Sequence, residues 1–318
     1  MLIAWVQQVL GDRQLTFAPA SADASFRRYF RFTQGASTYI AMDAPPEKED
    51  VRPFLHVTSL MQAAGVNVPQ VLAEDVMRGY LLLSDLGTRT YLDVLDDTNA
   101  GELFSAAIDS LIKWQLVSKP GELPSYDSGL LQRELNLFPD WYIAKHLQTI
   151  LPDQQQQVLN KMFELIIQRN LAQARVFVHR DYMPRNLMLS TPNPGVLDFQ
   201  DAVHGPISYD VASLFRDAFV SWPEERVIDW VARYWERARH ASLPVPDDFG
   251  HFYCDVEWMG LQRHLKVLGI FARINYRDGK PKYLADTPRF VGYVRHAAGR
   301  YDELRPLLKL FDQLGMQA

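Results

Sequence analysis

Three oxygen-bearing side chains lie close together in the sequence, each beside a short β-rich run. Asp181 follows the run RVFVH, Asn186 opens the run NLMLS, and Asp198 lies near the end of the run GVLDF. Short strands joined by tight connections bring such side chains to one edge. Carboxylate and amide oxygens suit Mg²⁺, and a carboxylate can also take the proton of an attacking hydroxyl. This set of groups therefore predicts phosphoryl transfer at a magnesium site.

The spacing of these residues strengthens that prediction. His179-Arg180-Asp181 with Asn186 matches H-R-D-x-x-x-x-N at every fixed position, and Asp198-Phe199 matches the start of D-F-G. In kinases the first Asp serves as the base, and the Asn and the second Asp hold the metal ions. An isolated Asp in a loop more often caps a turn. The joint order and context favour the kinase interpretation, with Asp181 as the catalytic residue.

Two parts of the usual nucleotide site are missing from the sequence. The strand TYIAMD contains no lysine and has Met42 near the expected position, and the chain contains no G-x-G-x-x-G motif. The loop ASADASFRRYF is instead expected to cover the phosphates, with Ser25 among the small residues that let backbone N–H groups approach. Arg28 or Arg31 is expected to supply the missing cation. For each arginine, an equal alternative is that the side chain lies on a solvated face of its strand and has no role in nucleotide binding.

The elements that must position these residues change in character along the chain. Residues 2–10 have the pattern of a helix, residues 14–43 of β structure with a hairpin turn at 34–37, and residues 51–63 of a second helix. Residues 68–75 and 79–87 indicate two more strands, and helical periodicity dominates 89–118 and 129–173. The pattern predicts a small β-rich lobe over 1–86 that covers the nucleotide. A helical lobe over 87–318 is expected to hold the catalytic loop and the acceptor.

Composition narrows the class of protein. The 318 residues are 47% apolar and 22% charged, with a net charge of −5 and one cysteine. An acidic chain is a poor nucleic-acid binder, and a single cysteine forms no intrachain disulfide. No apolar run approaches the length of a membrane span. We therefore expect a cytoplasmic protein without nucleic-acid or membrane partners. Its oligomeric state stays open.

The chain resembles the aminoglycoside phosphotransferase and choline kinase-like superfamily. Within this superfamily, the sequence most resembles bacterial kinases that phosphorylate the anomeric hydroxyl of N-acetylmuramate and N-acetylglucosamine. The supporting stretches are MDAPPE, RELNLFPDWYI, HRDYMPRNLM, VLDFQDAVHGPISYDVASL and WMGLQRHLKVLGIFARI. The resemblance implies an α+β, bilobal protein-kinase-like fold that uses ATP and Mg²⁺, with Asn186 and Asp198 as metal ligands. It also implies that backbone groups of Ser84, Asp85 and Leu86 contact adenine.

The resemblance further implies an amino-sugar acceptor in cell-wall recycling. Glu134 and Trp141 in RELNLFPDWYI, with Arg263 and Lys266 in WMGLQRHLKVLGIFARI, are the candidate substrate residues. For each of these residues the alternative is a purely structural role, as a charge on the surface or as an aromatic ring in the core. Ten residues separate Asp198 from Tyr209, too few for the longer activation segment of protein kinases, which favours a small-molecule acceptor. Two alternatives stay open: another small-alcohol kinase of the aminoglycoside or choline type, and a catalytically silent nucleotide-binding scaffold.

Overall fold

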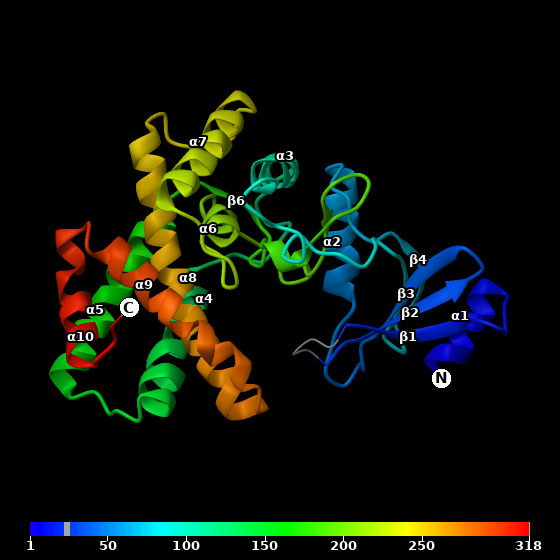
Figure 1. The fold of residues 1–318 in the computed structure, drawn as a ribbon, viewed down its shortest axis with the longest axis horizontal. Coiled ribbons are helices and arrows are strands. Elements are labelled where there is room, and N and C mark those ends of the chain that lie inside the picture. The colour runs from blue at the N-terminus through cyan, green and yellow to red at the C-terminus, as the bar shows by residue number, and fades with distance from the viewer. Residues whose placement is uncertain (22–25, 318) are drawn as a thin grey trace. The chain divides into compact units, whose positions relative to one another are not determined.

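The computed structural model describes residues 1–21 and 26–317 (Figure 1). By internal contacts the chain divides into two compact units. Unit 1 comprises Met1–Val117 and Arg185–Ala202, and unit 2 comprises Ser118–Pro184 and Val203–Ala318. The predicted boundary after residue 86 falls inside unit 1. As a boundary between functional lobes it stays a prediction.

Unit 1 is built around a five-stranded antiparallel sheet in the order β1-β2-β3-β5-β4. The strands and one short strand pair in this unit are β1 (Thr16–Ser21), β2 (Arg28–Gln34), β3 (Ser37–Asp43), β4 (Val71–Asp75), β5 (Tyr80–Ser84), β7 (Leu187–Met188) and β8 (Gly195–Val196). Its helices are α1 (Leu2–Leu10), α2 (Arg52–Ala63) and α3 (Ala100–Leu116), and the 3₁₀ turn η2 (Pro184–Asn186) leads into β7. The predicted helices at 2–10 and 51–63, and the five strands, are confirmed.

Local sequence explains the turns that hold this sheet together. The β2–β3 hairpin closes with Gln34 opposite Ser37, and Gly35 takes the positive φ of 59° that such a tight turn requires. Helix α1 ends at Gly11, which has a left-handed φ of 66°. Leu2 and Val6 of α1 pack with the sheet residues Phe32, Ala41 and Leu82 in one hydrophobic core cluster of this unit.

Unit 2 is largely helical and surrounds one long helix, α8 (Phe249–Asp278). The other elements are α4 (Ser128–Leu137), the π-helix η1 (Phe138–His146), α5 (Asp153–Leu171), β6 (Arg175–Val178), β9 (Val203–Pro206), α6 (Tyr209–Phe215), α7 (Glu224–His240), η3 (Pro281–Asp286), α9 (Thr287–Ala298), η4 (Asp302–Leu304) and α10 (Arg305–Gln313). Helix α8 packs against α4, α5, α6, α7, α9 and η1. A Cβ on Gly269 would lie 2.3 Å from the Leu137 carbonyl, so glycine is required where α8 meets the end of α4.

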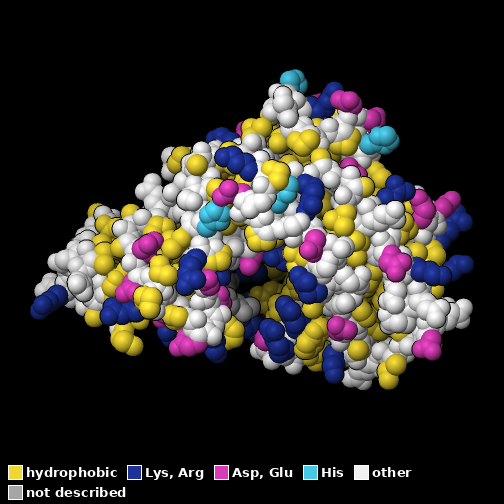
Figure 2. Space-filling model, turned by 180° about the vertical axis from the view of Figure 1, so that it is seen from behind, with side chains coloured by type: hydrophobic (Ala, Val, Ile, Leu, Met, Phe, Trp, Pro, Cys, Tyr) yellow, Lys and Arg dark blue, Asp and Glu magenta, His cyan; other side chains and the backbone are white. Residues whose placement is uncertain are grey.

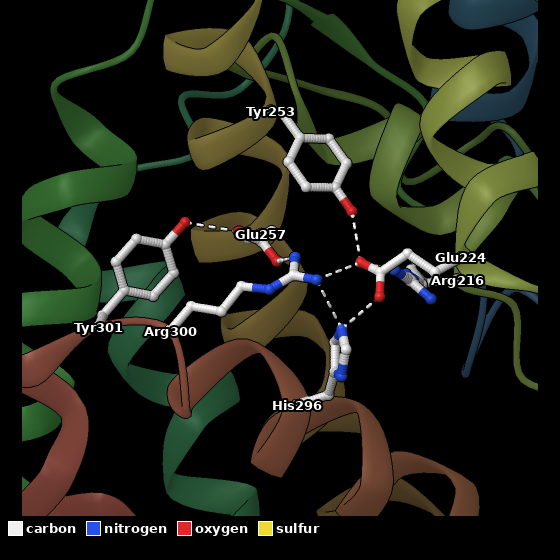
Figure 3. A network of polar contacts seen from close by, with 7 residues as sticks. All are labelled: Arg216, Glu224, Tyr253, Glu257, His296, Arg300 and Tyr301. Atoms are coloured by element: carbon white, nitrogen blue, oxygen red, sulfur yellow. Dashed lines mark hydrogen bonds and ion pairs between the residues drawn. The ribbon is translucent and has the colours of Figure 1, made fainter.

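A network of charged and tyrosine side chains joins three helices of unit 2 (Figure 3). Glu224 begins α7 and pairs with Arg300 at 2.6 Å and with His296 of α9 at 2.6 Å. Arg300 also pairs with Glu257 of α8, which accepts a hydrogen bond from Tyr301 at 2.6 Å. Glu257 thus contributes to holding the helices together.

The surface carries both signs of charge. On the face that Figure 2 shows, Lys and Arg side chains lie among Asp and Glu side chains and hydrophobic ones. Of the helices in the described part of the chain, none is both long and apolar enough to cross a membrane.

Candidate active site

The catalytic loop follows β6, the first strand of a two-stranded sheet in unit 2. Asp210 of α6 accepts hydrogen bonds from the backbone N–H of His179 at 2.7 Å and of Arg180 at 3.0 Å. The backbone N–H of Asp181 donates to Nδ1 of His179 at 3.2 Å. The loop is therefore fixed at three successive residues.

Two residues of the motif have backbone conformations that cost energy. Arg180 has a φ of 77° and Asp198 a φ of 64°, both in the left-handed region that disfavours side chains. Such conformations persist where surrounding contacts impose them, and they concentrate at functional sites. For Arg180 one such contact is the Asp210 carboxylate, which accepts its backbone N–H.

Burial sets the electrostatics of Asp210. The side chain is fully buried, and this burial raises its pKa to about 7, although the N–H groups of His179 and Arg180 oppose the rise. Asp181 raises it further, and Arg263 lowers it. The protonation of Asp210 is thus coupled to the geometry of the catalytic loop.

Asn186 and Asp198 are brought together by the small β7–β8 pair in unit 1. The backbone N–H of Leu197 donates to the Asn186 carbonyl at 2.9 Å, and Asn186 Nδ2 lies 3.4 Å from Asp198 Oδ2. Gln200 donates to the other Asp198 oxygen at 2.9 Å. Asp198 is an exposed residue.

This pair fits a magnesium ion held jointly with phosphates. One carboxylate and one amide side chain lie side by side, and their oxygens are the kind of hard ligand that Mg²⁺ prefers, with the remaining positions left to water and phosphate. The Asn186 amide has its nitrogen toward Asp198 and would have to turn over to present its oxygen to a shared ion. Within residues 1–21 and 26–317, no three His, Cys, Asp or Glu side chains gather into a protein-only metal site. Phe199 anchors the pair, because its buried ring lies 4.9 Å from the ring of Phe54 in α2.

A cavity of about 290 Å³ in unit 1 collects most of the predicted nucleotide and metal residues. Its lining includes Arg31, Ser84, Asp85, Leu86, Asn186 and Asp198. Ser25 lies outside the described residues. Sequence reasoning missed Arg185, which lines the same cavity from a variable position of the H-R-D-x-x-x-x-N motif. Its place directly before Asn186 was the available signal.

The structure distinguishes the two candidate arginines. Arg31 lines the cavity and binds both Asp85 oxygens at 2.6 and 3.1 Å, and it donates to the Gly87 carbonyl at 2.7 Å. Burial alone would raise the pKa of Asp85, but the Arg31 guanidinium and other hydrogen bonds outweigh it and lower that pKa. Arg28 instead pairs with Asp43 and is largely exposed.

The position expected for the strand lysine is apolar. Ile40 of β3 lines the cavity, and Met42 lies two residues further on the same face of the strand, fully buried.

The four candidate substrate residues all lie in unit 2. Glu134 of α4 and Lys266 of α8 are buried and pair with each other at 3.0 Å. Arg263 is buried, with a contact of 3.5 Å to the Arg216 carbonyl. Trp141 lies on η1 and is partly exposed. Glu134 and Lys266 are thus brought together, while direct contact of any of the four with substrate stays a prediction.

The chain is similar in sequence to known phosphotransferases. A model of the phosphotransferase enzyme family matches residues 16–246. The chain is 56% identical to an N-acetylmuramate/N-acetylglucosamine kinase of Pseudomonas aeruginosa, over 93% of this chain and 88% of that one. It is 50% identical to a kinase of the same name from Neisseria meningitidis, over 98% of this chain and 94% of that one.

Solved structures share the fold at low sequence identity. A Plasmodium vivax ethanolamine kinase superposes with a TM-score of 0.67 at 10% identity, over 92% of this chain and 86% of that one. The ADP-bound aminoglycoside phosphotransferase APH(2'')-Ib superposes with a TM-score of 0.61 at 12% identity, over 93% of this chain and 98% of that one. The predicted kinase-like α+β fold is confirmed.

Proposed function

This chain belongs to the phosphotransferase enzyme family, and from that premise we propose that it is an ATP-dependent kinase of N-acetylmuramate and N-acetylglucosamine. The phosphate would go to the anomeric hydroxyl, giving a sugar 1-phosphate. Three relatives that are 50–56% identical over most of the chain carry the name of this kinase, which supports the acceptor. The reaction would serve cell-wall recycling in the cytoplasm, where ATP is available.

The cavity in unit 1 is the observation that supports the proposed binding of ATP. It combines the 84–86 segment, whose backbone groups suit an adenine edge, with the side chains of Asn186 and Asp198. When bound, Mg²⁺ would neutralise phosphate charge, and these two side chains would hold it. Arg31 is the favoured small-lobe cation, because it lines this cavity and Arg28 does not appear in the lining.

The proposed transfer of phosphate to the acceptor hydroxyl depends on Asp181. A carboxylate at this position orients the acceptor hydroxyl and accepts its proton as the hydroxyl attacks the γ-phosphate. The backbone bonds to Asp210 and His179 hold the loop that carries Asp181, so that little reorganisation is needed. Trp141 would offer an aromatic face to the sugar ring, and Arg263 a cation to the lactyl carboxylate of N-acetylmuramate.

The proposal is tested by ADP release with a panel of acceptors. The panel contains both N-acetylated sugars, their 1-O-methyl glycosides, kanamycin, choline and ethanolamine. We expect release to depend on the free N-acetylated sugars and to fall to background with the glycosides, in which the anomeric oxygen is blocked. Strong turnover of kanamycin, choline or the glycosides, without turnover of the free sugars, would overturn the proposed acceptor.

A further inference from the structure

The carboxylate of Glu134 is the centre of a buried polar cluster in unit 2. Its side chain belongs to α4 and is 6% exposed. Oε1 receives two cations, Arg180 at 2.5 Å and Lys266 at 3.0 Å. Oε2 receives two neutral donors, Gln262 at 3.0 Å and the Tyr126 hydroxyl. A carboxylate accepts about four hydrogen bonds, so Glu134 has no acceptor position left for a sugar hydroxyl.

Arg180, the residue directly before Asp181, is held at both ends. Asp210 binds its backbone N–H at 3.0 Å, and Glu134 binds its guanidinium at 2.5 Å. Its φ of 77° is one that an arginine adopts only when its surroundings impose it. The two carboxylates together supply that constraint, one on the backbone and one on the side chain.

The cluster closes on itself through α8 and α6. Lys266 also donates to the Tyr209 hydroxyl at 3.0 Å, and Tyr209 precedes Asp210 in α6. The rings of Tyr209 and Tyr126 lie edge to face, with centroids 5.4 Å apart. A ring of contacts therefore runs from Asp210 through Arg180, Glu134 and Lys266 back to Tyr209.

Glu134 remains ionised throughout the neutral range. Burial alone would raise its pKa, but Lys266, Arg180 and the hydrogen bonds from Tyr126 and Gln262 outweigh this and lower the pKa to about 2. The arginine is thus paired with a permanent anion. In kinases whose activation segment is ordered by phosphorylation, a phosphate on that segment supplies an anion for arginine.

We propose that Glu134 is a positioning residue that fixes the orientation of Asp181 through Arg180, and that it is not a ligand of the acceptor. The inference rests on the proposed kinase function, in which Asp181 is the base. It assigns to α4 a role in holding the catalytic loop, as an alternative to the predicted contact of Glu134 with substrate. The pairing is built into the chain and needs no phosphorylation.

The first test is Glu134→Gln, which keeps the size of the side chain and removes its charge. We expect kcat to fall about 10- to 100-fold, because small misplacements of a reacting group cost rates of this order. KM for each sugar and for ATP should stay within about threefold, and the loss should be equal for both sugars. Glu164→Gln, an exposed residue of α5, is the matched control and should leave all constants unchanged.

A ligand role gives the opposite pattern. If Glu134 bound the acceptor, KM for sugar would rise with kcat largely kept. That result, or unchanged kinetics in Glu134→Gln, would overturn the proposal. A double-mutant cycle with Arg180→Met adds a readout that general destabilisation does not move. Because Glu134 acts through Arg180, the double variant should lose no more than the larger single loss, whereas multiplied losses would contradict the proposal.

Two further arms cover loss of folding and failure of the proposed function. If Glu134→Gln shows no cooperative thermal transition, the cycle is repeated in a Lys266→Met background, where one charge of each sign is removed. If the unmodified enzyme shows no sugar-dependent turnover, the proposed acceptor fails. The same variants are then compared by sugar-independent ATP hydrolysis, in which water is the nucleophile. A 10- to 100-fold loss there supports the positioning role, and an unchanged rate overturns it.

Discussion

At the residue scale, the proposed chemistry depends on the Asp181 carboxylate. The substitution Asp181→Asn keeps the shape of the side chain and removes the proton acceptor. We expect kcat to fall about 10²- to 10⁴-fold, the usual contribution of general base catalysis, while the Kd for ATP stays unchanged. Turnover and equilibrium ATP binding, measured on the same preparation, check the predicted fall in kcat and the unchanged Kd. An Asn variant with near-normal turnover would show that the base lies elsewhere.

Asp198 has a different role and predicts a different defect. Asp198→Ala removes the one carboxylate of the proposed metal pair, so phosphate charge would lack a fixed counter-ligand. We expect ATP binding to lose most of its dependence on Mg²⁺ and kcat to fall as well. The measurement is ATP affinity over a Mg²⁺ titration. If the variant keeps the full magnesium dependence of the unmodified protein, another group holds the metal.

The two arginines of β2 form a matched pair for testing the small-lobe cation. Arg31→Ala leaves Asp85 without its bidentate partner beside the cavity, whereas Arg28→Ala removes an exposed guanidinium that pairs with the buried Asp43 outside the cavity lining. We therefore expect Arg31→Ala to raise KM for ATP about tenfold or more and Arg28→Ala to change it less than threefold. Steady-state kinetics of both variants decide between them. Equal, unchanged constants would reject either arginine as the cation and direct attention to Arg185.

At the scale of elements, α6 positions the catalytic loop through Asp210. The pKa of this carboxyl is raised from 3.8 to about 7 by burial, so the folded state holds its proton more tightly than the unfolded chain. The stability that this proton contributes is fully present below pH of about 4 and is lost as pH rises to about 7. The slope between these limits is at most about 1.4 kcal/mol per pH unit.

Asp210→Asn removes this titration and isolates its effect. We expect the free energy of unfolding of the unmodified protein, minus that of the variant, to fall between about pH 4 and pH 7 and to level off above. Denaturant unfolding of both proteins across this range measures the difference. A difference that does not change with pH would contradict the raised pKa.

The elements differ in how far their sequence revealed them. The strand at 175–178 and the helices at 2–10 and 52–63 have apolar patterns and end signals of their own, and they were predicted. The strand β9 was missed, because VHGP contains Gly205 and Pro206 and forms a strand through its pairing with β6 and its backbone bonds to residues 124–126. The π-helix η1 was also missed, because its widened turn starts where Pro139 interrupts an otherwise ordinary helical pattern.

At the scale of the whole molecule, local patterns did not show that residues 185–202 belong to unit 1. Their place is set by contacts distant in sequence. The backbone N–H of Tyr91 donates to the Leu187 carbonyl at 2.7 Å, and that of Val196 to the Asn67 carbonyl at 2.7 Å. The motif predicted Asp181, Asn186 and Asp198 because their spacing is fixed. The partners of Glu134 could not be predicted, because Tyr126, Arg180 and Gln262 meet it only after two helices and two loops have packed.

The central claim is that this kinase transfers phosphate to the anomeric hydroxyl of an N-acetylated amino sugar. A ³¹P–¹H correlation spectrum of the product formed from ATP and N-acetylmuramate tests it most directly. We predict that the product phosphorus couples to the anomeric proton and that Asp181→Asn forms no such product under the same conditions. A phosphorus coupled to the protons on carbon 6, or no phosphorylated sugar from the unmodified protein, would contradict the claim.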